Sequence, residues 1–70
     1  MLAKEARKLV GCEVVWTDGT SFIECEGMLN RVSGRTAFIE NSGGYDWKWL
    51  PNMIGLKRKP EFIIGNGNNG

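Results

Sequence analysis

Apolar side chains near the N-terminus recur at the spacing of a helix. Leu2, Ala6 and Leu9 are separated by four and three positions, and charged residues fill most of the places between them. This spacing puts the three side chains on one face of a short amphipathic helix. Gly11 follows, and glycine readily adopts the left-handed conformation in which many helices end. Because so short a helix is marginal by itself, we expect it to dock on the rest of the chain.

Beyond this helix, apolar and polar residues alternate, which is the pattern of β-strands. Two alternating runs, 12–16 and 21–25, flank the pair Asp18-Gly19. An Asp-Gly pair between two such runs is typical of a tight hairpin turn. The sequence therefore predicts a β-hairpin over residues 12–25.

The length of the hairpin loop decides which side chains share a face. With a two-residue loop, Val14 lies opposite Ile23 and Cys12 lies opposite Cys25. A three-residue loop would change these pairings. The two-residue register predicts one core-facing set of side chains. This set is Val10, Cys12, Val14, Trp16, Ile23 and Cys25.

The strand pattern continues to residue 58, interrupted by turns rich in glycine or containing proline. The second strand extends over residues 28–32, and further strands are predicted at 36–40, 45–50 and 54–58. Before the last strand, Pro51 fixes its own φ and lacks an N–H donor, so the chain there holds a single turn of the 3₁₀ type. Short strands about ten residues apart predict a small, strongly bent barrel. Closure of such a barrel would protect its edges.

Two stretches carry a resemblance to known domains. The run 14–22, preceded by a helix and followed by residues 27–29, resembles the opening of an Sm-like domain. The run 49–54 resembles the proline and one-turn helix that precede the last strand of SH3-like domains. The resemblance implies a mostly β fold: a small five-stranded SH3-like/Sm-like barrel with a short N-terminal α-helix and a 3₁₀ turn before the last strand.

This resemblance extends over about residues 2–59 and concerns architecture, which constrains function poorly. Sm-like domains hold RNA with motifs that residues 32–36 and 54–56 do not match. No functional residue is therefore carried over. We expect one domain at residues 1–60. Residues 61–70 are rich in glycine and asparagine with little to bury, which indicates a flexible tail.

Composition removes several classes of function. The chain has 70 residues, no histidine and two cysteines. The commonest general base and metal ligand is thus absent, and two cysteines are too few for a closed zinc site. So small a core also cannot easily support a deep substrate cleft. We expect a protein that is not an enzyme and that uses no metal or other cofactor.

Hydropathy indicates where the protein resides. No stretch approaches the length of about 20 apolar residues that a membrane helix needs. The N-terminus also lacks the apolar core of a signal peptide. We therefore expect a cytoplasmic protein without membrane contact, with Cys12 and Cys25 as reduced thiols.

Charge is distributed unevenly along a chain whose net charge is +1. Residues 12–30 contain four acidic and no basic residues, whereas residues 31–59 contain six basic and two acidic residues. This polarity suits contact with an anionic partner or head-to-tail contact between subunits.

The basic half also holds an aromatic stripe, Tyr45, Trp47 and Trp49, whose members project from one face of a strand. Asp46 and Lys48 point the other way, so the favoured interpretation buries the rings in the core. The rings are too large in total to be all buried, and an exposed one could stack on a nucleobase. Single-stranded nucleic acid is therefore the expected ligand. The candidate binding residues are Arg31, Arg35, Tyr45, Trp47, Lys48, Trp49, Lys57, Arg58 and Lys59.

A second set of apolar residues, Val15, Phe22 and Phe38, is expected on the outer face of the barrel. An apolar patch there needs a cover. The N-terminal helix is one candidate, and a protein partner or a second copy of the chain is the other. The alternative function is therefore a protein-interaction or self-assembling module that uses these three residues.

Overall fold

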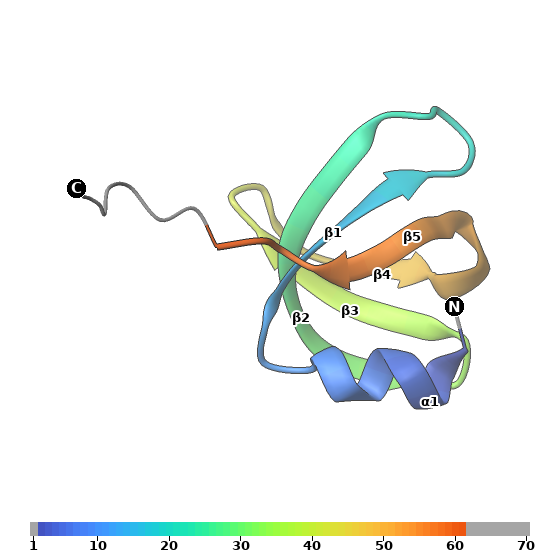
Figure 1. Cartoon of the computed structure of the whole chain (residues 1–70), viewed down its shortest axis with the longest axis vertical. Helices are drawn as coiled ribbons and strands as arrows, with labels where there is room; N and C mark the ends of the chain where they lie inside the picture. The colour runs from blue at the N-terminus through green and yellow to red at the C-terminus, as the bar shows by residue number, and fades with distance from the viewer. Residues whose placement is uncertain (1, 62–70) are drawn as a thin grey trace.

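The computed structural model describes residues 2–61 of the chain. Two short helical segments come first, followed by five strands with a 3₁₀ turn before the last one (Figure 1). The elements are α1 (Ala3–Ala6), η1 (Arg7–Leu9), β1 (Glu13–Asp18), β2 (Glu24–Ser33), β3 (Thr36–Asn41), β4 (Gly44–Trp49), η2 (Leu50–Asn52) and β5 (Met53–Arg58). The predicted mostly β class, with its N-terminal helix and its late 3₁₀ turn, is confirmed. Of the predicted tail at 61–70, only Glu61 lies within the described residues.

The five strands form one antiparallel sheet in the order β4-β3-β2-β1-β5. Figure 1 shows β2 curving strongly, so that its two ends face different parts of the molecule. The arrangement is compatible with a small barrel-like fold. Within residues 2–61, however, β4 and β5 do not pair, and the expected closure of the barrel is wrong. The 3₁₀ turn at Pro51 redirects the chain away from β4, and β5 pairs with β1 instead.

The core lies inside the curve of the sheet. Its members come from the helix, from four of the strands and from the 3₁₀ turn: Ala6, Val14, Trp16, Leu29, Ala37, Ile39, Leu50, Met53 and Leu56. Each of them is at most 5% exposed. The centre of the inner face is therefore buried, and the outer face is open to solvent.

The N-terminal helix docks on this core, as its pattern predicts. Ala6 is fully buried, and Leu9 packs partly buried against the core. Leu2, which we expected on the docking face, is 71% exposed. It precedes the first helical residue and has an extended backbone, so the helical spacing does not include it. Gly11 has a φ of +91°, which confirms the left-handed conformation expected after the helix.

The register of the first hairpin differs from the prediction. Val14 lies opposite Gly27, and Trp16 lies opposite Cys25. Val14 and Trp16 are buried as expected, but Ile23 is 62% exposed. The expected pairing of the two cysteines is therefore wrong, and so is the placement of Ile23 in the core.

The remaining members of the expected core-facing set are also less buried than predicted. Val10 is 42% exposed, and its placement in the core is wrong as well. Cys12 and Cys25 are half-buried free thiols. Cys25 still packs against the core from its position opposite Trp16.

The cause of the shifted register is a wider loop, organised by one carboxylate. Asp18 Oδ1 accepts hydrogen bonds from the backbone N–H of Thr20 at 2.7 Å and from that of Ser21 at 3.2 Å. The Asp18 carbonyl accepts a bond from the Phe22 N–H at 2.7 Å, and the Asp18 N–H donates to the Ile23 carbonyl. The side chain of Asp18 thus stabilises a loop longer than the two-residue turn expected from Asp-Gly.

Candidate functional site

The outer face of β3 and β4 carries a cluster of aromatic rings. Phe38 on β3 lies directly opposite Trp47 on β4. The Phe38 ring stacks on that of Tyr45, with centroids 5.4 Å apart and planes within 11°, and contacts the Trp47 ring at 4.8 Å. Trp49 continues the row, opposite Thr36. We call Phe38, Tyr45, Trp47 and Trp49 the aromatic platform.

The platform is open to solvent. Tyr45 is 63% exposed, Trp47 47% and Trp49 52%. The favoured interpretation, in which the three rings of β4 fill the core, is therefore wrong. The expectation that some rings are partly exposed is confirmed.

The partners of β4 explain why its aromatic side faces outward. Ala37 and Ile39 of β3 are fully buried, and the residues opposite them on β4 are Lys48 and Asp46. Because residues that lie opposite each other project to the same side of a sheet, β4 turns its charged side inward. Its aromatic side is left on the outside.

Two arginines flank the platform. Arg31 on β2 lies directly opposite Phe38, because a register shift between Leu29 and Arg31 brings it there. Arg35 lies in the β2–β3 turn, and its carbonyl accepts a hydrogen bond at 2.8 Å from the N–H of Leu50, the residue after Trp49. Arg31 and Arg35 are both exposed. Arg31 thus lies next to Phe38 on the neighbouring strand, and Arg35 lies in the turn at the Trp49 end of the platform.

The other candidate basic residues lie elsewhere. Lys48 projects from the opposite side of β4 and forms an ion pair with Asp46 at 3.2 Å. Lys57, Arg58 and Lys59 are on or just after β5, at the other edge of the sheet from β4. The nine candidate residues thus do not form one surface. The structure brings together five of them, Arg31, Arg35, Tyr45, Trp47 and Trp49, with Phe38 in addition.

The three residues of the expected apolar patch are also separated. Val15 lies on β1 between Glu26 and Lys57. Phe22 lies in the β1–β2 loop, where it is 76% exposed and has a φ of +60°. Phe38 belongs to the aromatic platform. The rings of Tyr45 and Trp47 pack against Phe38, while the N-terminal helix packs on the core through Ala6.

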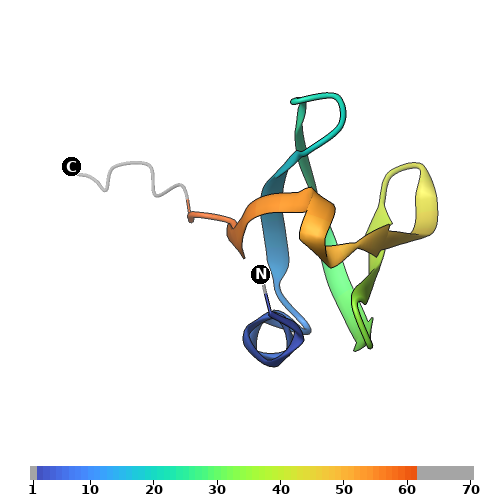
Figure 2. The same ribbon diagram turned by 90° about the vertical axis from the view of Figure 1, so that its right-hand side faces the viewer.

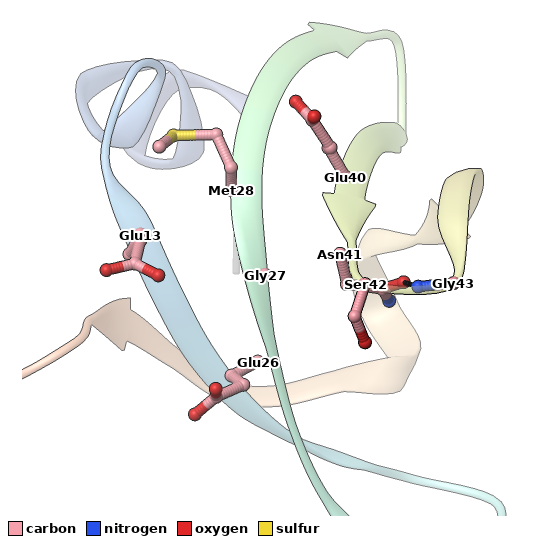
Figure 3. Close-up of a pocket in the computed structure, with 8 residues that line it drawn as sticks. All are labelled: Glu13, Glu26, Gly27, Met28, Glu40, Asn41, Ser42 and Gly43. Atoms are coloured by element: carbon pink, nitrogen blue, oxygen red, sulfur yellow. Dashed lines mark hydrogen bonds between the residues drawn. The ribbon is translucent and has the colours of Figure 1, made fainter.

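A shallow hollow of about 700 Å³ opens beside the platform (Figure 3). Its lining comes from β1, β2, the end of β3 and the β3–β4 turn: Glu13, Glu26, Gly27, Met28, Glu40, Asn41, Ser42 and Gly43. Figure 3 shows the three carboxylates standing at separate positions around it. Among residues 2–61, no group of three potential ligands is arranged to hold a metal ion.

The carboxylates of the hollow nevertheless make the charge around the aromatic platform different at its two ends. Glu40 lies opposite Tyr45, and Asn30 donates a hydrogen bond to its carboxylate at 3.2 Å. One end of the platform therefore borders an acidic surface, while the other end borders Arg35. Sequence reasoning missed this hollow because its glutamates come from three different strands.

Comparison with known proteins gives no relative. No protein-family model, no curated protein and no solved structure matches the chain. Within residues 2–61, no helix is long and apolar enough to cross a membrane.

Proposed function

We propose that the chain binds single-stranded nucleic acid on the aromatic platform, without catalysing a reaction. The observation that supports this most directly is the exposed row Tyr45, Trp47 and Trp49 on one strand. Bases stack on exposed aromatic rings with about 1–3 kcal/mol per base, largely without regard to sequence. A duplex keeps its bases stacked on each other, so the ligand is a single strand.

The charges around the platform favour one placement of the strand. Arg31 and Arg35 stand where they can contact phosphates, whereas the hollow beyond Tyr45 is lined by Glu13, Glu26 and Glu40. Phosphates are attracted to the first region and repelled by the second. The nucleic-acid strand therefore lies across Trp47 and Trp49, with its sugar-phosphate backbone towards the arginines.

We also propose that the architecture is that of an SH3-like or Sm-like small barrel in a cytoplasmic protein. The order β4-β3-β2-β1-β5 and the 3₁₀ turn between β4 and β5 support this. β2 is strongly bent and pairs with both β1 and β3 (Figure 1), which supports the proposal as well. A crystal structure of the protein tests the proposed architecture directly.

The test of binding is a titration of a fluorescently labelled oligothymidylate, followed by anisotropy. Trp47→Ala should weaken binding by about 5- to 150-fold, the equivalent of one lost stacking interaction. Ile54→Ala is the matched control, because Ile54 is a comparably exposed apolar residue on β5, at the other edge of the sheet. No binding by the unmodified protein, or equal losses in both variants, would contradict the proposal.

Salt dependence tests the part of the arginines. Each phosphate contact contributes about 0.7 to the slope of log affinity against log salt for a single strand. Arg31→Gln and Arg35→Gln should each lower this slope, whereas Arg58→Gln on β5 should not. An unchanged slope in the first two variants would remove the arginines from the interface.

A second candidate function is contact with a protein partner through the β1–β2 loop. The observation that favours it is Phe22, whose positive φ and high exposure occur together. A bulky residue held in this backbone conformation is strained, and such strain often marks functional positions. If this loop is a contact surface between copies, Phe22→Glu should abolish self-association. If the protein is monomeric at high concentration and Phe22→Glu changes neither solubility nor stability, this candidate is excluded.

A further inference from the structure

β4 is an edge strand whose outward backbone groups have no strand partner among the described residues. The Leu50 N–H donates to Arg35 on the β3 side. Backbone groups alternate in direction along an antiparallel strand, so Tyr45, Trp47 and Trp49 direct their N–H and C=O groups away from β3. The Trp47 N–H accordingly has no strand partner within residues 2–61 and donates a hydrogen bond to the Asp46 carboxylate at 2.8 Å.

The sequence of β4 is self-complementary, because two antiparallel copies of it place matching side chains opposite each other. On either side of Trp47 stand Asp46 and Lys48, and beyond them Tyr45 and Trp49. An antiparallel pair of such strands, related by a two-fold axis at Trp47, places Asp46 opposite Lys48 of the second copy. The same axis places Tyr45 opposite Trp49 of the second copy. Opposite charges and aromatic pairs in these positions stabilise a sheet.

Within residues 2–61, no other layer of the chain covers either face of β4. Tyr45, Trp47 and Trp49 on one face are exposed, and on the other face Asp46 is exposed and Lys48 half-buried. Figure 2 shows the β3–β4 hairpin, in yellow, at the side of the molecule away from the N-terminal helix. A strand from another molecule therefore has access to this edge.

We propose that two copies of the chain associate through their β4 strands, antiparallel about Trp47, to form one continuous sheet. The other edge is less suited to a second copy, because β5 carries Lys57 and Arg58 and lacks acidic residues. Closed two-fold contacts are the commonest form of self-association. In the single chain, the Asp46–Lys48 ion pair and the Asp46 bond to the Trp47 N–H protect the edge. In the pair, these groups bind across the interface.

Charge reversal at two positions tests the register. Asp46→Lys places two lysines opposite each other, and Lys48→Asp places two aspartates opposite each other. Sedimentation velocity from about 10 μM to about 1 mM should show dimers of the unmodified chain, and either variant alone should associate at least about tenfold more weakly. An equimolar mixture of the two variants should recover dimers containing one chain of each.

The mixture separates contact between copies from contact within a chain. In each variant the charges at positions 46 and 48 are alike within the chain, but between the two variants they are opposite. Only pairing across the interface can therefore restore association in the mixture. Native mass spectrometry of variants that differ in mass identifies the mixed dimer.

The controls are Glu5→Lys and Lys4→Asp, which make the same changes of charge at exposed positions on α1. Both should associate like the unmodified chain, and circular dichroism should show the same strand content in every variant. A monomer throughout the concentration range overturns the proposal. So does a mixture that fails to recover dimers, or a dimer that Phe22→Glu abolishes and the β4 variants leave intact.

Discussion

β1 and β4 each carry large apolar side chains at alternate positions, yet the two strands place their tryptophans on opposite sides of the sheet. Trp16 on β1 is 5% exposed, whereas Trp47 and Trp49 on β4 are 47% and 52% exposed. β1 lies between β2 and β5, and β4 lies at an edge beside β3 alone. The alternation thus defines two faces in both strands, but it does not determine which face is buried.

The neighbouring strands determine it instead. The inner face at β3 is already occupied by Ala37 and Ile39, and their partners on β4 are the charged residues Lys48 and Asp46. A charged side chain at the periphery of an edge strand reaches water, as Lys48 and Asp46 do. Trp16, in contrast, is placed centrally, where burial of a large ring contributes most.

The largest expected effect on stability is the difference between replacing a buried and replacing an exposed tryptophan. Trp16→Ala should lower the free energy of unfolding by about 3–5 kcal/mol, because it leaves a cavity in the core. Trp47→Ala should lower it by only about 1 kcal/mol, the value of an exposed ring contact. Urea denaturation followed by circular dichroism measures both. Equal losses would show that β4 contributes to the core as much as β1 does.

A second pair of variants compares the inner side of β2 with the tip of the β3–β4 hairpin. A Cβ on Gly27 would meet Ile39 Cγ2 at 2.5 Å and the Glu40 carbonyl at 2.9 Å. Gly27→Ala should therefore lower the free energy of unfolding by about 1–3 kcal/mol through overpacking. Gly43→Ala should change it by about 0.5 kcal/mol or less, since only the Asn41 side chain is near. A tolerated Gly27→Ala would mean that the strands can separate at this point.

Most elements could be predicted from the sequence, because alternation and turn residues are local signals. The strands near 36–40, 45–50 and 54–58, and the 3₁₀ turn at Pro51, were predicted within a residue or two. The first hairpin was predicted too, but its register was not, since the hydrogen bonds that the Asp18 side chain accepts define its loop. Such side-chain contacts to the backbone have no periodicity.

The composition of the candidate site could be predicted only in part. The residues Tyr45, Trp47 and Trp49 were singled out by their spacing, but their exposure depends on the place of β4 in the sheet. Arg31 lies opposite Phe38 only because the register shifts after Leu29. Such a shift changes which residues of two strands lie opposite each other. Strand order and bulges arise from contacts between distant segments, so a local pattern does not contain them.

The smallest expected effect distinguishes the turns that follow β1 and β3. After β3, the neutral amide of Asn41 accepts a hydrogen bond from the Gly43 N–H at 2.8 Å. After β1, the Asp18 carboxylate performs this task, and the hydrogen bonds from the Thr20 and Ser21 N–H groups lower its pKa below the ordinary value of 3.8. Of these two turns, only the β1–β2 loop should therefore lose stability at acid pH.

The direction of this response follows from proton binding. Because the pKa of Asp18 is lower in the folded chain than in the unfolded one, the unfolded chain binds the proton more readily. The contribution of Asp18 to stability is complete above pH 3.8 and is lost as the pH falls towards the folded value. Thermal unfolding between pH 2 and pH 6 should show a weaker acid dependence for Asp18→Asn, whose amide oxygen can accept the same bonds. Asn41→Ala, the control at the other turn, should keep the acid dependence of the unmodified protein. An Asp18→Asn profile parallel to that of the unmodified protein would show that the charge of Asp18 does not stabilise the loop.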